Sequence, residues 1–74
     1  MKIVTKNVSN NSGRSQILTK GGGKQKTVNV EQAKGLNWNH GNAAGELALK
    51  LGLTWHNDVQ HEMSEDGTQH TFIF

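Results

Sequence analysis

The sequence predicts an α+β domain in which an antiparallel sheet packs against a single helix, in the order β-β-β-α-β-β. Three observations predict this class. The stretch 37–52 has a helical period, short runs of β-forming residues lie on both sides of it, and Asp66-Gly67 indicates a hairpin near the C-terminus. With 74 residues, the whole chain, 1–74, is expected to form a single small domain.

Three strands are expected before the helix. Each run is rich in β-forming residues, and the runs cover residues 2–8, 14–20 and 24–30. Between the first two runs, the Asn- and Gly-containing segment 9–13 favours a turn, because both residue types tolerate positive φ. Between the second and third runs, the glycine triplet 21–23 provides a permissive loop.

The alternation of the third run predicts how it pairs with the second. Lys26, Val28 and Val30 share one face of this run. A two-residue turn at Gly22-Gly23 places Ile17 opposite Val28. This register collects the apolar side chains of both strands on one face, which makes it the expected one.

The helix is expected over 37–52, after a connection at 31–36. Asn37 or Asn39 is the predicted N-cap, because an Asn side chain accepts a hydrogen bond from a free first-turn amide. Gly52 is the predicted left-handed residue after the helix. The apolar residues form one stripe at helical spacing, which consists of Ala43, Ala44, Leu47, Ala48 and Leu51.

Two further features of the helix carry expectations about packing. Gly41 and Gly45 each cost roughly 1 kcal/mol relative to Ala, so another element is expected to pack closely against them. Trp38 and Trp55 flank the helix and are expected to plug its two ends.

The C-terminal residues predict a hairpin. Asp66-Gly67 is a strong signal for a two-residue type I′ turn. With these residues as the loop, Met63 faces His70 and His61 faces Phe72. The turn and the alternation agree on this register, which supports both.

The net charge of +2 conceals a strong asymmetry. Residues 1–35 carry seven Lys or Arg side chains and one carboxylate, a net charge of +6. Residues 36–74 carry one Lys and five carboxylates, a net charge of −4. A basic half joined to an acidic half bears on the choice of partner and on solubility.

Composition excludes several classes of protein. The chain has no Cys, so disulfides and thiolate metal sites are excluded. No apolar run approaches the roughly 20 residues that span a bilayer, and the N-terminus lacks the apolar core of a signal peptide. A cytoplasmic location without membrane contact is therefore expected. The hydrophobic content of 32% predicts a thin core, which a second copy or a bound partner would complete.

The sequence offers little support for a catalytic or metal-binding site. Residues 21–24 lack the Lys-Ser/Thr and the helix of a phosphate-binding P-loop. His61 and His70 lie on neighbouring strands, but no carboxylate accompanies them, and zinc usually needs three or four convergent ligands. The carboxylates of the acidic half cluster near a hairpin tip, where they are expected to be solvated. No enzymatic activity, catalytic residue, metal or cofactor is therefore expected.

The basic N-terminal hairpin is the main candidate for function. Its predicted nucleic-acid-binding residues are Arg14, Gln16, Lys20, Lys24, Gln25 and Lys26. Lys and Arg neutralise phosphates, Gln reads base edges, and a two-stranded ribbon fits the major groove. An ordinary solvated edge explains the same residues without any ligand. The alternative function is a protein-binding module that uses the helix or the C-terminal hairpin against a host protein or a second copy.

Two resemblances extend these expectations. The run 12–52 resembles the three-strand-plus-helix DNA-binding domains of plant AP2 factors and phage integrase arms, through Gly13-Arg14, the Gly-Lys hairpin tip and the Ala-Ala-Glu helix at 43–46. The chain departs from that pattern in lacking the aromatic and Arg-rich base-reading positions and in adding a hairpin after the helix. Residues 27–48 are similar to small uncharacterised reading frames of actinobacteria and their phages, which implies a phage or host accessory protein.

Overall fold

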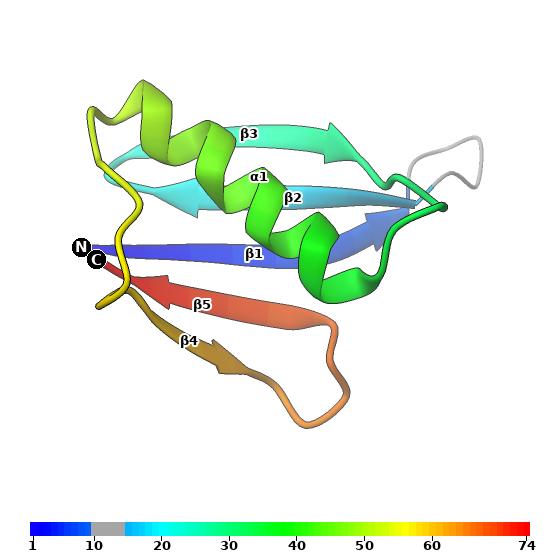
Figure 1. Cartoon of the computed structure of the whole chain (residues 1–74). Helices are drawn as coiled ribbons and strands as arrows, with labels where there is room; N and C mark the ends of the chain where they lie inside the picture. Colours follow the sequence, from blue (N-terminus) through cyan, green and yellow to red (C-terminus); the bar gives the residue numbers. More distant parts are fainter. Residues whose placement is uncertain (10–14) are drawn as a thin grey trace.

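A five-stranded antiparallel sheet carries one helix on one of its faces (Figure 1). The computed structural model describes residues 1–9 and 15–74. The elements are β1 (Lys2–Ser9), β2 (Ser15–Gly21), β3 (Lys24–Asn29), α1 (Leu36–Lys50), β4 (Gln60–Met63) and β5 (Gln69–Ile73). The strand order is β3-β2-β1-β5-β4, so β1 lies at the centre. The predicted α+β class and order of elements are confirmed.

The pairing of β1 with β5 joins the two ends of the chain. Lys2 is the partner of Ile73, and Thr5 is the partner of His70. Beyond the last pair, the Phe74 N–H donates to the Met1 carbonyl at 2.8 Å. The N- and C-termini therefore lie side by side at one end of the sheet (Figure 1).

The predicted register of the N-terminal hairpin is confirmed. Ile17 pairs with Val28, and the loop consists of Gly22 and Gly23. Both glycines have positive φ, 56° and 76°, which a type I′ turn requires and which Gly adopts without a steric penalty.

The C-terminal hairpin has the predicted register but a wider loop than predicted. The pairs His61–Phe72 and Met63–His70 are both present. The Ser64 N–H donates to the Gln69 carbonyl at 2.9 Å, which leaves four residues, 65–68, in the loop. The predicted two-residue type I′ turn is wrong, because Gly67 has positive φ whereas Asp66 does not.

Asp66 explains why the wider loop is stable. Its carboxylate accepts hydrogen bonds from Ser64 Oγ at 2.8 Å, Thr68 Oγ1 at 2.8 Å and the Thr68 N–H at 3.1 Å. The Ser64 hydroxyl, followed by the Thr68 groups, lowers the pKa of Asp66 to about 2. The loop is thus closed by side-chain hydrogen bonds around one carboxylate.

Helix α1 ends as predicted but begins differently. Gly52 has φ of 73° and follows the last turn. The predicted N-cap, Asn37 or Asn39, is wrong, because the helix begins at Leu36 and its cap is Gly35 without a side-chain hydrogen bond. Asn39 instead lies within the helix and is buried.

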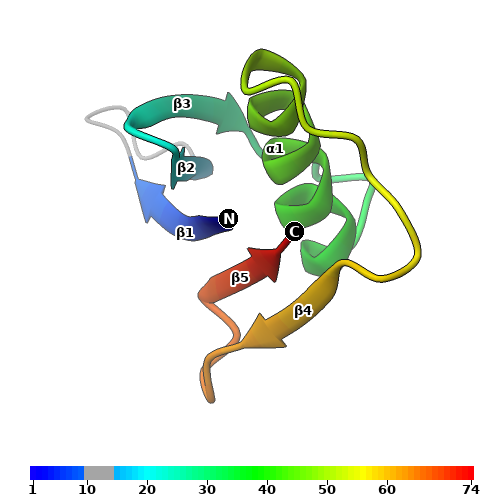
Figure 2. The same ribbon diagram turned by 90° about the vertical axis from the view of Figure 1, so that its left-hand side faces the viewer.

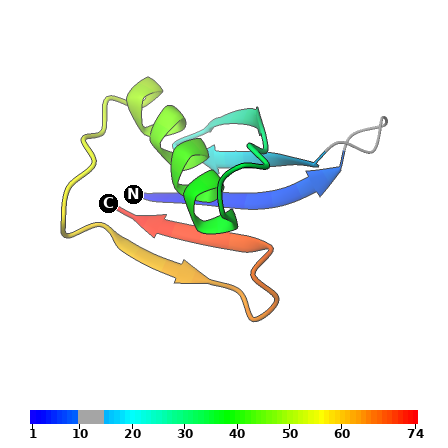
Figure 3. The ribbon, with the colours of Figure 1, turned by 45° about the vertical axis from the view of Figure 1, so that its right-hand side comes forward.

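Helix α1 packs over β1, β2 and β3, and the core between the helix and the sheet also includes β5 (Figure 2). The predicted apolar stripe is confirmed for Ala43, Ala44, Leu47 and Ala48, which are all buried. Opposite them, the buried apolar side chains of the sheet are Ile3, Ile17 and Phe72. The small Ala side chains allow the helix to approach the sheet closely, and β4 lies at the sheet edge away from the helix (Figure 3).

Two packing expectations for the helix are wrong. A Cβ atom at Gly41 or Gly45 would have no neighbouring atom of residues 1–9 or 15–74 within 4 Å, so no described element packs closely against either glycine. Trp38 and Trp55 are 45% and 47% exposed and do not plug the helix ends. Trp55 packs instead against the rings of the C-terminal hairpin, since its ring centroid lies 5.3 Å from that of Phe72.

Candidate nucleic-acid interface

No described helix or strand covers the face of the sheet opposite α1 (Figure 2). On β1, Ile3 and Thr5 are fully buried on the helix side. Because side chains alternate along a strand, Val4 and Lys6 project from the other side. The pairing of β1 with β2 sets Lys20 beside Val4 on that same side. This uncovered side is called the open face below.

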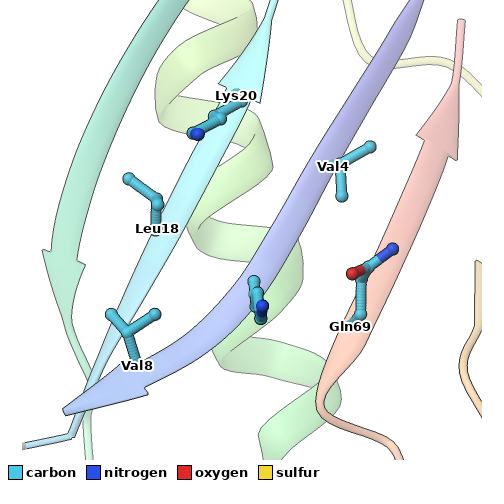
Figure 4. A pocket seen from close by; sticks show the side chains of 6 residues that line it. Val4, Val8, Leu18, Lys20 and Gln69 are labelled. Atoms are coloured by element: carbon cyan, nitrogen blue, oxygen red, sulfur yellow. The ribbon is translucent and has the colours of Figure 1, made fainter.

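A shallow hollow of about 310 Å³ lies on the open face (Figure 4). Its lining comes from β1, β2 and β5 and consists of Val4, Lys6, Val8, Leu18, Lys20 and Gln69. The three apolar side chains are half-buried and form its floor, whereas the two lysines and the glutamine are exposed. The hollow thus combines an apolar floor with a cationic, hydrogen-bonding rim.

The lysines of the open face lie close enough to act together. Lys20 pairs with Val4 and Lys6 pairs with Leu18, so the two lysines are diagonal neighbours at roughly 7–8 Å. Lys2 stands in the same diagonal relation to Lys20 on the other side. Strands β1, β2 and β3 contain no carboxylate, so nothing on these strands neutralises the three lysines. The result is a zigzag of positive charge across the open face.

Three of the six predicted nucleic-acid-binding residues lie on this face. Lys20 and Gln25 are direct partners across β2 and β3. Gln16 lies farther along β2 and its Nε2 donates to Asn29 Oδ1 at 2.9 Å. This amide pair leaves one carbonyl oxygen and one NH2 group free to meet a ligand.

The other three predicted residues do not join this group. Lys26 lies on the helix side of β3, where its Nζ is 3.4 Å from Glu46 Oε1 in the only ion pair of the described part of the chain. Lys24, two residues away on the same strand, also projects to the helix side, because side chains alternate. Arg14 lies outside the described residues.

Sequence reasoning missed the contributions of β1 and β5. Lys2, Lys6 and Gln69 lie on the open face because β1 pairs with β2 on one side and with β5 on the other. The alternation from Lys2 to Val8 indicates a two-sided strand, but the pairing with β5 is not visible in the sequence.

A second cluster, which we call the histidine column, lies on the helix side of the sheet. It consists of His40 on α1, His70 on β5 and His61 on β4. The His40 and His70 rings are stacked at 3.8 Å between centroids, and the His61 and His70 rings at 4.8 Å. His61 Nε2 lies 2.7 Å from His70 Nδ1, and His40 Nδ1 lies 2.6 Å from Thr5 Oγ1. Sequence reasoning placed His61 and His70 together but did not bring His40 to them.

Burial favours the uncharged form of the two buried members of the column, His40 and His70. His40 is fully buried, and its Nε2 has no hydrogen-bond partner among the residues that the structure describes. Burial, followed by repulsion from His70 and His61, lowers the pKa of His40 to about 4. Burial also lowers the pKa of His70.

The column does not form a metal centre. Within residues 1–9 and 15–74, no group of three or more His, Cys, Asp or Glu side chains is placed to hold a metal ion. The facing nitrogens of His61 and His70 are hydrogen-bonded to each other at 2.7 Å, and His40 Nδ1 is engaged with Thr5 Oγ1, so these nitrogens already have partners.

The described helix is neither long nor apolar enough to cross a bilayer.

Comparison with protein-family models, with curated proteins and with solved structures finds no significant match to this chain.

Proposed function

We propose that the chain is a small non-enzymatic binding protein that engages nucleic acid through the open face of β1, β2 and β5. The zigzag of Lys2, Lys20 and Lys6, the last two of which line the hollow, carries this proposal. These lysines have no carboxylate on their own or adjacent strands, so they attract phosphates, and releasing the counterions of the nucleic acid drives such binding.

The side chains between the lysines suggest how sequence would be read. Gln16 and Asn29 offer one acceptor and one donor side by side, a pattern that matches the edge of adenine in the major groove. No aromatic residue is present on β1, β2 or β3, so stacking of unpaired bases is not supported there. Double-stranded nucleic acid is therefore the proposed class of ligand.

A second copy of the chain fits the open face less well. Two copies packed face to face would bring the Lys6 and Lys20 side chains of both copies together without a carboxylate on the central strands. Like charges held close together cost free energy, whereas a polyanion neutralises them.

A salt titration with random duplex DNA tests the proposal. We expect binding at low ionic strength and a linear fall of log K with log salt, with a slope of roughly −0.9 for each phosphate contact. Absence of binding at low salt would overturn the proposal. Parallel titrations with single-stranded DNA and duplex RNA identify the preferred ligand.

Paired variants locate the surface. The double variant Lys6→Gln/Lys20→Gln should reduce the magnitude of the salt slope by about 1.8, because two phosphate contacts are lost. The control Lys34→Gln/Lys50→Gln removes the same charge from the helix side and should change the slope little. Equal effects of the two variants would mean that net charge, rather than the open face, determines binding.

The second candidate function is a protein-binding module that uses the C-terminal hairpin. Trp55 favours it, because this large aromatic side chain is 47% exposed beside Phe72 and Phe74. Sedimentation of the wild type and Trp55→Ala tests self-association through this side chain: a dimer that Trp55→Ala dissociates supports it, and a monomer excludes self-association. A cytoplasmic location and a phage or host accessory role stay predictions.

A further inference from the structure

The histidine column connects three elements that are distant in the sequence. We propose that it is a proton-sensitive latch, which holds α1 and the β4–β5 hairpin against β1 while its buried imidazoles are uncharged and opens the folded structure on mild acidification. This inference is independent of nucleic-acid binding. It rests on the stacking of the three rings, on their hydrogen bonds and on one buried nitrogen without a partner.

The hydrogen bonds define where protons sit in the closed state. His70 Nε2 lies 3.2 Å from the Gly67 carbonyl, which only accepts, so this nitrogen carries a hydrogen. In neutral His70, Nδ1 is then an acceptor, and His61 Nε2 donates to it at 2.7 Å. The pair can hold one added proton on the free His61 Nδ1 without losing this contact. A second added proton would place a hydrogen on both His61 Nε2 and His70 Nδ1, and the two donors would repel each other and break the contact.

His40 accommodates a proton even less well. Its Nδ1 is engaged with the Thr5 hydroxyl, and the doubly protonated ring would need an acceptor at Nε2 as well. That nitrogen is buried without a partner, so the added charge would be both buried and unpaired. The stacked His70 ring, 3.8 Å away, adds repulsion whenever it is charged.

No described carboxylate offsets this charge. From β1 the column meets the uncharged Thr5, and β4 places Met63 opposite His70. Glu62 projects from the opposite face of β4 because side chains alternate. Glu46 of α1 is paired with Lys26 of β3, and Asp66 is engaged with the Ser64 and Thr68 groups of its own loop. A proton on the column therefore meets no compensating anion.

The direction of the pH effect follows from this arrangement. The pKa of His40 is about 4 in the folded protein and about 6.5 in the unfolded chain, so the unfolded chain binds more protons between these values. The folded state is favoured above pH 6.5, and this advantage is lost as the pH falls toward 4. His40 alone should raise the unfolding equilibrium constant on the order of 100-fold between pH 7.5 and 4.

Unfolding by urea at a series of pH values tests the latch. In His40→Asn, the side-chain amide can still meet Thr5 near the position of Nδ1 but cannot titrate. The control His56→Asn removes an exposed histidine outside the column. We expect the roughly 100-fold contribution to persist in the control and to disappear from His40→Asn. Equal acid sensitivity of His40→Asn and the wild type would overturn the proposal.

Imidazole NMR titration of the wild type gives a second test that does not depend on the folding of a variant. The resonances of the His40 ring should not titrate above about pH 5, whereas an exposed imidazole has an ordinary pKa of about 6.5. A His40 midpoint near 6.5 in the folded protein would overturn the latch.

Discussion

Asn39 shows how one side chain can organise a connection from inside a helix. Its Oδ1 accepts from the Glu31 N–H at 2.7 Å, and its Nδ2 donates to the carbonyls of Glu31 at 3.1 Å and Gly35 at 2.9 Å. Asn39 is 3% exposed, and its hydrogen bonds to the more exposed connection are partly shielded from water. Asn39 thereby fixes the segment between β3 and α1, although it is not the N-cap that its position in the sequence suggests.

Asn39→Ala should lower the free energy of unfolding by about 2 kcal/mol, because it leaves the Glu31 N–H and the Lys34 carbonyl without their hydrogen-bond partner. Asn42→Ala is the matched control, since Asn42 is exposed on the same helix. It should change stability by less than about 0.5 kcal/mol. Chemical denaturation measures both variants, and equal losses would show that the Asn39 hydrogen bonds contribute nothing specific.

At the scale of elements, α1 carries two glycines that its environment does not require. Neither Gly41 nor Gly45 has positive φ, and a Cβ at either position would meet open space. Gly22 differs, because its φ is +56° and a Cβ there would lie 2.8 Å from Leu51 Cδ2. The same residue type is thus required by the turn of one hairpin and is merely tolerated within the helix.

Gly41→Ala and Gly45→Ala should each raise the free energy of unfolding by roughly 0.5–1 kcal/mol, because Ala restricts the unfolded chain and favours the helix. Gly22→Ala, as the contrasting variant, should destabilise the protein through its strained turn. Thermal unfolding checks all three. If either helix substitution destabilised the protein, the added methyl group would have to clash with a neighbour that the described residues do not provide.

At the scale of the whole molecule, the strands of the sheet differ in how well their backbone amides are protected from solvent exchange. Strand β1 lies at the centre and pairs with β2 and β5 on its two sides. Strand β4 lies at an edge, spans only four residues, and all four are exposed. Since α1 packs over β1, β2 and β3, the C-terminal hairpin depends more on its own contacts and on the histidine column.

Hydrogen exchange should therefore be fastest in β4 among the strands. Amides of β4 that are hydrogen-bonded to β5 should show protection at least about tenfold lower than the amides of β1, because local opening needs to break fewer buried contacts. The comparison uses only amides that are hydrogen-bonded to a neighbouring strand, because the amides on the free edge of β4 exchange fast without any opening. Equal protection of both strands would mean that the sheet opens as one cooperative unit.

About half of the candidate site follows from local patterns. Lys20 and Gln25 were expected to lie together and do, because the turn between β2 and β3 sets their register. Lys24 and Lys26 were expected to join them, but alternation sends their side chains to the helix side. The contribution of Lys6 depends on which strand pairs with β1, so it could not be predicted from local sequence.

The sequence by itself determined the α+β class, the end of the helix and the registers of both hairpins. Those features depend on neighbouring residues: the alternation of side chains, the apolar stripe, and glycines able to adopt positive φ. Only the tertiary structure decided the strand order, the composition of the open face and the meeting of His40 with His61 and His70. These features require β1 to pair with β5 across the length of the chain, and such non-local pairing is selected by the burial of the whole core rather than by any local signal.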